Sequence, residues 1–260
     1  MSGPAVRLSW AQVNEIGMRA ENQDSIGIAR DGELACFVVA DGTGGHSGGA
    51  VASRLVVEAL LANFAAAPGC DAAVLRACID AASASVAQAR QADPALSEMS
   101  STVAALVVDA AAAQAVWTHL GDSRVYLFRA NQLFSVTIDH SLARQLVNSG
   151  YGGTGPIDVR DHPQRHILLA AIGAENDTPA GTSDGVVALQ AGDALLLCSD
   201  GLWEWINEAQ METALSVTDR VDGWLSAMCT LAARAAATSG CVRDNFSACA
   251  IRVHAAEDLA

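Results

Sequence analysis

Residues 102–136 read TVAALVVDAAAAQAVWTHLGDSRVYLFRANQLFSV, and this segment indicates the fold class of the chain. Short apolar segments are separated here by tight polar turns, a spacing typical of β-strands joined by hairpins. The predicted strands cover residues 102–108, 115–119, 124–128 and 133–136. Consecutive strands joined by such short turns predict an antiparallel meander.

Around this meander, helices and strands occur in blocks rather than in alternating β-α-β units. Helical spacing of apolar residues predicts a helical hairpin over residues 48–66 and 71–91, with Asp71 as the N-cap of its second helix. Further strands are predicted at residues 6–13 and 34–40, from Ile167, Val186 and Ala194 onward, and at 246–253; further helices are predicted from Ser141, Asn207 and Asp219. Segregated elements of this kind favour an α+β fold with antiparallel sheets over a parallel doubly wound fold.

The chain of 260 residues is near the upper size for one hydrophobic core, and 51% of its residues are hydrophobic. Aspartates flanked by glycine or asparagine recur across nearly the whole length. If these aspartates form one site, the two ends of the chain must meet in one fold. We therefore expect a single domain over residues 1–260.

Charge and cysteine content narrow the function classes. The formal net charge is −14, and all 15 basic residues are arginine. A phosphate-backbone binder needs the opposite sign, so neither a nucleic acid nor an anionic membrane is an expected partner. The seven cysteines include no Cys-x-x-Cys pair and lie mostly in apolar stretches, which is typical of buried, reduced thiols in the cytoplasm. No segment is predicted to be a signal peptide or a membrane span, since Glu58 and Asn63 interrupt the most apolar run.

The acidic segments carry the strongest functional signal. They are Glu21-Asn22-Gln23-Asp24, Asp41-Gly42-Thr43-Gly44-Gly45-His46, Gly121-Asp122-Ser123-Arg124, Ser199-Asp200-Gly201 and Arg243-Asp244-Asn245. Carboxylates and main-chain carbonyls are the hard oxygen ligands that suit Mg²⁺ or Mn²⁺. A single Asp-Gly pair is also the commonest turn dipeptide, and for any one of these segments alone a plain turn is the simpler interpretation. It is their combination that favours a site for divalent cations.

The motifs in their order along the chain resemble the metal-dependent protein phosphatases of the protein phosphatase 2C (PPM) family, in its bacterial form. The matching residues are Arg19 to Asp24, Val39 to Gly42, Gly44 to His46, Gly121 to Tyr126, Asp139 to Ser141, His162 to Arg165, Gly192-Asp193 with Leu197 to Trp203, and Asp244 to Ser247. The resemblance extends from Gly17 to Val253. It implies an α-β-β-α sandwich of two antiparallel sheets flanked by helical hairpins, with the metal site at one edge between the sheets.

The resemblance also implies metal-ligand roles at the matching positions. Asp41 would bridge two Mn²⁺ or Mg²⁺ ions, and the Gly42 carbonyl would bind the second of them. Asp200 and Asp244 would hold the first ion. Asp24 would serve the second ion, mainly through its waters.

Three further positions bear on the reaction. Asp122, together with Asp200, would form a weaker third metal site, and Arg19 would clamp the phosphate. A water or hydroxide that bridges the two ions would then attack the phosphorus, so Arg19 and Asp41 are the expected catalytic residues. Thr43 stands where many relatives carry methionine or histidine, so no side chain can be assigned as the general acid.

The expected function is the hydrolysis of phosphoserine and phosphothreonine in proteins, by a monomeric cytoplasmic enzyme that opposes a bacterial serine/threonine kinase. The alternative is a catalytically weak module of the same fold that binds phosphoproteins, an interpretation motivated by Thr43. We interpret His46, His140 and His162 as structural hydrogen-bonding residues within turns. The glycine-rich residues 148–162 are predicted to form a mobile loop that faces the substrate.

Overall fold

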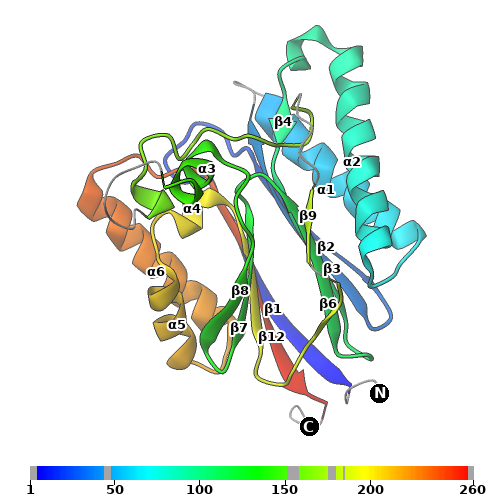
Figure 1. Cartoon of the computed structure of the whole chain (residues 1–260), viewed down its shortest axis with the longest axis vertical. Coiled ribbons are helices and arrows are strands. Elements are labelled where there is room, and N and C mark those ends of the chain that lie inside the picture. Colours follow the sequence, from blue (N-terminus) through cyan, green and yellow to red (C-terminus); the bar gives the residue numbers. More distant parts are fainter. Residues whose placement is uncertain (1–4, 44–47, 151–157, 175–179, 184, 257–260) are drawn as a thin grey trace.

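The computed structural model describes residues 5–43, 48–150, 158–174, 180–183 and 185–256. Two antiparallel sheets lie face to face, with helices on their outer sides (Figure 1). This arrangement confirms the predicted α+β class and the α-β-β-α sandwich.

The first sheet contains both ends of the described chain. Its strands, in spatial order, are β1 (Val6–Glu15), β12 (Phe246–Ala255), β11 (Ala194–Cys198), β7 (Arg124–Arg129) and β8 (Gln132–Val136). β1 and β12 pair along their whole length, from Val6 opposite Ala255 to Glu15 opposite Phe246. The end of β1 and the start of β12 therefore meet at the same end of the sheet. Their residues there, Glu15 and Phe246, are 231 positions apart in sequence.

The second sheet carries the meander. Its strands in order are β10 (Val187–Ala188), β6 (Gln114–Leu120), β5 (Val103–Asp109), β3 (Leu34–Thr43) and β2 (Asp24–Asp31); the short strand β4 (Ser100–Ser101) pairs with β3, and β9 (Gly181–Thr182) pairs with β6. The side chains that face inward from the two sheets, such as Phe37, Leu106, Leu127 and Ile251, form one apolar core between them. This core is the rigid body from whose edge the loops of the candidate site extend.

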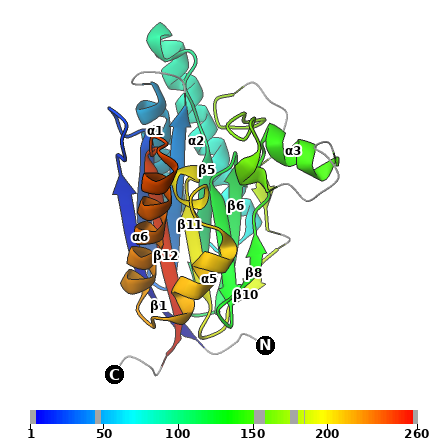
Figure 2. The ribbon, with the colours of Figure 1, turned by 90° about the vertical axis from the view of Figure 1, so that its left-hand side faces the viewer.

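Helices cover the outer faces (Figures 1 and 2). The hairpin α1 (Gly48–Ala66) and α2 (Ala72–Ala92) packs on the second sheet, and Asp71 caps α2 through the N–H groups of Ala73 and Val74. The helices α4 (Asp200–Trp203), α5 (Glu208–Ser216) and α6 (Val221–Ser239) pack on the first sheet. The remaining elements are α3 (Leu142–Asn148) and two 3₁₀ turns, η1 (Pro94–Leu96) and η2 (Val159–Asp161).

Some sequence expectations need correction. β2 was not predicted, and no strand begins at Ile167, where the chain forms only isolated bridges from Leu168 to Ser141 and from Ile172 to Ser101. The strand expected from Val186 is the two-residue β10. Part of the predicted mobile loop at 148–162 lies outside the described residues, as does His46.

Helix α1 is long and apolar enough by composition to cross a membrane. In this structure it instead buries Val56, Leu60 and Phe64 against the second sheet and α2, as a core helix does. The cysteines are all free, and they are buried or half-buried except Cys241, which is exposed. The expectation of buried thiols is therefore wrong for Cys241.

Candidate metal centre

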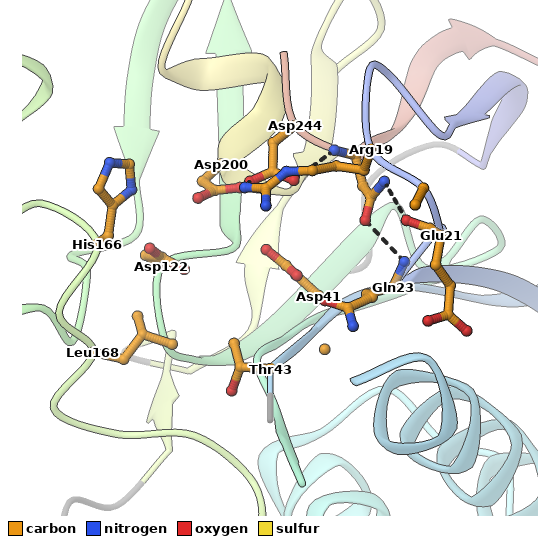
Figure 3. A pocket seen from close by; sticks show the side chains of 13 residues that line it. Arg19, Glu21, Gln23, Asp41, Thr43, Asp122, His166, Leu168, Asp200 and Asp244 are labelled. Atoms are coloured by element: carbon orange, nitrogen blue, oxygen red, sulfur yellow. Dashed lines mark hydrogen bonds and ion pairs between the residues drawn. The ribbon is translucent and has the colours of Figure 1, made fainter. Parts of the chain in front are cut away.

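An acidic cavity of about 580 Å³ opens at the edge of the sandwich (Figure 3). Its lining includes Asp41, Gly42, Asp122, Asp200 and Asp244, which come from separate parts of the chain, and also the predicted phosphate clamp Arg19. Asp24 does not line the cavity and is 5% exposed. The structure thus brings the predicted site residues together, with Asp24 buried beneath the others.

Asp24 and Asp41 face each other directly across β2 and β3. Side chains in such a cross-strand pair lie about 4.5–5.5 Å apart at Cβ, and like charges there destabilise a sheet. One Asp24 oxygen, Oδ2, accepts a hydrogen bond of 2.7 Å from the Ser199 hydroxyl. The Asp41 backbone is held by Thr102, whose hydroxyl accepts from the Asp41 N–H at 3.0 Å. Two carboxylates fixed in this way repel each other when both are ionised, and a cation between or beside them would relieve that repulsion.

Asp200 is the first residue of α4, directly after the buried strand β11. Gly201 follows because a Cβ there would collide with the Asn245 carbonyl. Asp122 lies in the turn between β6 and β7, where Gly121 has φ +100° and packs on Thr102. The Trp203 indole N–H donates to the Asp122 carbonyl at 2.9 Å, which ties this turn to α4. Tight backbone packing therefore fixes both aspartates.

Arg19 and Asp244 meet because the end of β1 lies beside the start of β12. Their side chains form an ion pair at the mouth of the cavity, where Arg19 is 55% exposed. Asn245 holds the loop that carries Arg19: its amide donates to the carbonyls of Ile16 and Glu21, at 2.7 and 2.9 Å, and its oxygen accepts from the Gln23 N–H at 2.9 Å. Asn245 was quoted in a motif, but the sequence did not predict this positioning role.

Burial and mutual repulsion perturb the carboxylates of the metal-free site. Burial raises the pKa of Asp24 to about 6, and the charge of Asp244 adds to the rise. Burial also raises the pKa of Asp122 to about 7. The pKa values of Asp41 and Asp200 lie well above the usual aspartate range, through burial first and then through the neighbouring carboxylates. Such a cluster is unfavourable in ionised form unless a cation joins it.

Two local features fit a divalent cation. Asp24 Oδ1 is buried and accepts no hydrogen bond from any described residue. Gly42 and Gly49 pack so closely that a Cβ on Gly42 would collide with the Gly49 carbonyl. Because Gly42 has no side chain, its main chain lines the cavity directly. Oxygen ligands only, mostly carboxylate, match the preference of Mg²⁺ and Mn²⁺. The residues present therefore fit the metals that the resemblance implies, and the individual ligand roles stay predictions.

The raised pKa values predict an opposite pH dependence with and without metal. A raised aspartate pKa stabilises the fold below the unfolded value near 3.8, and that contribution is lost as pH rises through about 6 for Asp24 and about 7 for Asp122. Cations bind the ionised carboxylates, so saturating Mn²⁺ should raise the melting temperature by about 5 °C or more at pH 7.5 and much less at pH 5.

The measurement is the melting temperature in EDTA and in Mn²⁺ from pH 5 to 8. His119 and His140 are stacked with a centroid distance of 4.7 Å, and burial lowers the pKa of both, that of His140 to about 4. Their protonation destabilises the fold in acid with or without metal, so it cancels in the difference between the two curves. Parallel curves in EDTA and Mn²⁺ would contradict the predicted site.

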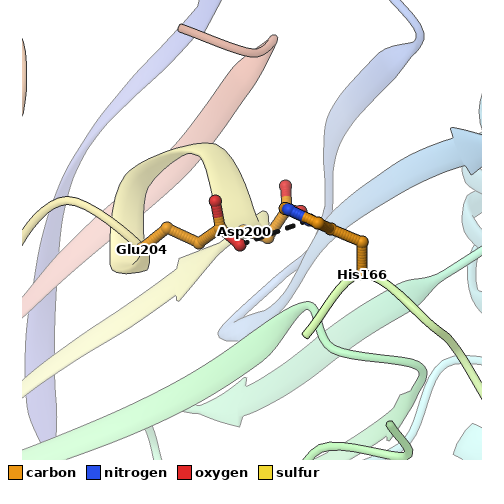
Figure 4. Close-up of side chains that lie close together, drawn as sticks. All are labelled: His166, Asp200 and Glu204. Carbon is orange, nitrogen blue, oxygen red and sulfur yellow. Dashed lines mark ion pairs between the residues drawn. The ribbon is translucent and has the colours of Figure 1, made fainter. Parts of the chain in front are cut away.

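Two residues near Asp200 were missed by sequence reasoning. The ligand atoms of His166, Asp200 and Glu204 lie within 4.8 Å of one another (Figure 4). Glu204 accepts from the Arg165 guanidinium at 3.0 Å and lies 3.5 Å from His166. His166 directly follows the family-like stretch His162 to Arg165, and its nearness to a residue 34 positions further on, Asp200, has no local sequence signal.

The other singled-out residues have structural contacts. His140 Nδ1 accepts from the Gly121 N–H at 3.2 Å, and His162 Nδ1 accepts from the Gln164 N–H at 3.1 Å, as expected for turn-stabilising histidines. Thr43 lines the cavity and its hydroxyl is 2.7 Å from that of Ser100. No acidic or imidazole side chain stands at Thr43, so this position provides no general acid.

The family model described as protein phosphatase 2C matches residues 14–240. The serine/threonine protein phosphatase PstP of Mycobacterium tuberculosis is 33% identical over 214 residues, which is 82% of this chain but 40% of that protein. The serine/threonine phosphatase Stp of Listeria welshimeri is 32% identical over 219 residues, covering 80% of this chain and 84% of the relative. The chain belongs to the protein phosphatase 2C family. It spans less than half of the mycobacterial relative's length.

A crystal structure of the catalytic domain of PstP in complex with two manganese ions superposes with a TM-score of 0.79 at 29% identity, covering 96% of this chain and 99% of that one. The family assignment and the fold are thereby confirmed. The site of this chain resembles that of the metal-binding phosphatases. Asp244 lies just beyond the residues that the family model matches, yet the structure places it in the cavity.

Proposed function

We propose that this chain hydrolyses phosphoserine and phosphothreonine in proteins with the help of two Mn²⁺ or Mg²⁺ ions. The observation that carries the proposal is the convergence of Asp41, Asp122, Asp200 and Asp244 on one cavity with Arg19 at its mouth. The names of its relatives and the manganese bound by one of them support it.

The carboxylates and the Gly42 carbonyl are suited to bind the metal ions. Asp41, the Gly42 carbonyl, Asp200 and Asp244 would hold the ions, with Asp24 in support. Bound there, the pair would supply a water of lowered pKa between them as the nucleophile and neutralise the phosphoryl oxygens. Without cations, the carboxylates would repel a phosphate dianion.

Arg19 is suited to hold the phosphate. A guanidinium offers a planar fork of N–H donors that matches two phosphate oxygens. In the structure this fork binds Asp244, and at 55% exposure it can turn from that carboxylate to a substrate. The ion pair keeps Arg19 over the cavity before substrate arrives, which lowers the entropy cost of phosphate binding.

The finer assignments extend from this proposal. Asp122 and Asp200, with His166 and Glu204 nearby, would form the weaker third metal site. The protein would act as a monomer opposite a serine/threonine kinase, and in the cytoplasm, which its seven free cysteines favour. Leaving-group protonation would rely on water, since Thr43 has no acidic proton to donate near neutral pH.

The discriminating experiment compares binding with turnover. Phosphate release from a phosphothreonine peptide is measured with Mn²⁺ and with EDTA, and peptide binding is measured in the same samples. We expect metal-dependent release. Binding of the peptide by folded, metal-loaded protein without any release would instead favour the phosphoprotein-binding module.

A further inference from the structure

A second cavity, of about 690 Å³, lies between α6 and the strand β1. We call it the α6 groove, and its lining includes Val13, Met18, Cys229, Ala233, Ala237 and Phe246. Helix α6 packs across both β12 and β1 (Figure 2). Because β1 is the last strand of its sheet, no further strand among the described residues covers this side of α6.

The α6 groove is mostly apolar and opens onto an apolar rim. Ile16, Met18 and Val242 are 42%, 67% and 63% exposed. Met18 lines the groove, and Ile16 and Val242 each lie between two lining residues in sequence. Exposed apolar side chains gathered beside a cavity are typical of a binding surface. Glu15 and Arg243 are the charged side chains of the lining, and their opposite signs leave the groove near neutral within a strongly acidic molecule.

The α6 groove adjoins the acidic cavity through two crossing segments. Met18 lines the groove and its neighbour Arg19 lines the cavity; Arg243 lines the groove and its neighbour Asp244 lines the cavity. The Met18 N–H donates to the Arg243 carbonyl at 2.9 Å, which joins the segments. A chain bound with one residue at Arg19 therefore needs to pass only over Met18 to reach the groove.

Arg243 favours a ligand of the α6 groove that offers hydrogen-bond acceptors. Its guanidinium stacks on the Phe246 ring at 3.7 Å, and its Nε and Nη2 are covered yet donate to no described residue. A covered donor without an acceptor is costly. Arg243 is only half-buried, so a change of its rotamer would turn these donors toward the groove, where the carbonyl groups of an extended peptide are acceptors that a purely apolar ligand lacks.

We propose that the α6 groove is a substrate-docking site, which binds apolar side chains of the phosphoprotein segment that flanks the phosphorylated residue. This inference rests on the proposed function and narrows its substrate class: segments with apolar rather than acidic flanks. Acidic flanks would be repelled by the carboxylate cavity and by the net charge of −14.

The test uses two phosphothreonine peptides of equal length and charge. One peptide carries leucine and valine at about the second to sixth positions on both sides of the phosphothreonine, and the other carries serine and asparagine there. These positions are chosen because an extended chain advances about 3.3–3.6 Å per residue and so reaches from Arg19 into the groove. The expected kcat/KM is at least about tenfold higher for the apolar peptide. Equal values for the two peptides would overturn the proposal.

Exposed alanines on α6 allow a variant that leaves the core intact. Ala233→Glu and Ala237→Glu each place a charge in the α6 groove. In these variants the kcat/KM values for the apolar and polar peptides should become about equal, because the KM for the apolar peptide rises. The matched control is Ala92→Glu, also exposed, at the end of α2, which should keep the preference. Turnover of p-nitrophenyl phosphate, too small to span both cavities, should not change in any of the three. Groove variants that retain the full preference would refute the docking site.

A readout independent of turnover separates this inference from the proposed function. Cys241 is exposed and lines the α6 groove, so its alkylation by a maleimide, followed by mass spectrometry, reports occupancy. A phosphonate analogue of the apolar peptide should slow this alkylation and the polar analogue should not. Equal protection by both analogues would overturn the docking site. If the wild-type protein with Mn²⁺ does not turn over p-nitrophenyl phosphate at all, only the proposed function is refuted. If the unphosphorylated apolar peptide protects Cys241 equally and changes p-nitrophenyl phosphate turnover, the groove is an effector site and the proposal is wrong.

Discussion

Asp41→Asn should lower phosphate release by at least about a thousandfold, which is the largest loss of activity that we expect from a single substitution. Asparagine keeps the shape of aspartate and the backbone bond from the Asp41 N–H to Thr102. It removes the charge that faces Asp24 across β2 and β3 and that the proposal assigns to both ions. Metal affinity and turnover should therefore fall together, while the fold remains.

The metal-free variant supplies an internal check on folding. Removing one of several mutually repelling carboxylates should leave Asp41→Asn at least as stable as the wild type in EDTA at pH 7.5. The stabilisation by Mn²⁺ should shrink in the same variant. The matched control is Asp31→Asn, at the exposed far end of the same strand pair, which should change neither property. Full phosphate release by Asp41→Asn would refute the assignment of this site.

Arg124→Ala should destabilise the protein by about 3–5 kcal/mol, because it removes the two short hydrogen bonds to buried Asp139 and leaves that carboxylate with only the longer ion pair to Arg144, at 3.8 Å. The two side chains are 2% and 1% exposed. They form a bidentate ion pair, in which both distances between the guanidinium nitrogen and the carboxylate oxygen are 2.7 Å. Arg124 also donates to the Tyr126 hydroxyl at 2.9 Å and stacks over Trp203 at 3.5 Å. The loss is read from urea unfolding monitored by tryptophan fluorescence.

An exposed pair of the same chemistry is the control. Arg220 and Asp222 also form two hydrogen bonds, of 3.1 and 2.7 Å, but their side chains are 80% and 57% exposed, so Arg220→Ala should change stability little. The double variant Arg124→Met with Asp139→Leu should recover part of the loss, since apolar replacement removes both buried charges. Equal effects of Arg124→Ala and Arg220→Ala would show that burial does not decide the cost.

This ion pair also connects stability to the candidate site. Trp203, on which Arg124 stacks, donates its indole N–H to the Asp122 carbonyl. Arg124→Ala should therefore loosen the turn that carries Asp122, and any remaining activity should require a higher metal concentration. An unchanged metal requirement would limit the role of the pair to stability.

Local sequence signals predicted much of the fold and of the site. Asp41-Gly42 lies near the end of the buried strand β3, and Asp200-Gly201 begins α4 just after the buried strand β11. The structure explains the glycines by collisions that a side chain would make with Gly49 and with Asn245. The ends of β1 and β12 could be expected to meet, since Arg19 and Asp244 belong to one family-like site. The Asp-Gly features were predictable because each depends on a few neighbouring residues, whereas the meeting of β1 and β12 followed from the family resemblance.

The misses have a common cause in tertiary context. β2 contains Gly27, which is unfavourable in a strand by propensity, yet a side chain there would come within 2.6 Å of Val57 and Leu61 on α1. The strand predicted from Ile167 has the apolar composition of a strand but lacks a continuous partner, so it forms only isolated bridges at Leu168 and Ile172. Both outcomes depend on elements far away in sequence, which local patterns do not report.

The central claim is that the acidic cavity binds two divalent cations and that hydrolysis of phosphothreonine requires them. Its most direct test is a titration of metal-free protein with Mn²⁺ at pH 7.5, with calorimetry to count the ions and release of phosphate from a phosphothreonine peptide at each step. We predict two tightly bound ions per chain, a third that binds more weakly, and no release until the first two are bound. Undiminished release in excess EDTA, or a folded protein that binds no Mn²⁺, would contradict the claim.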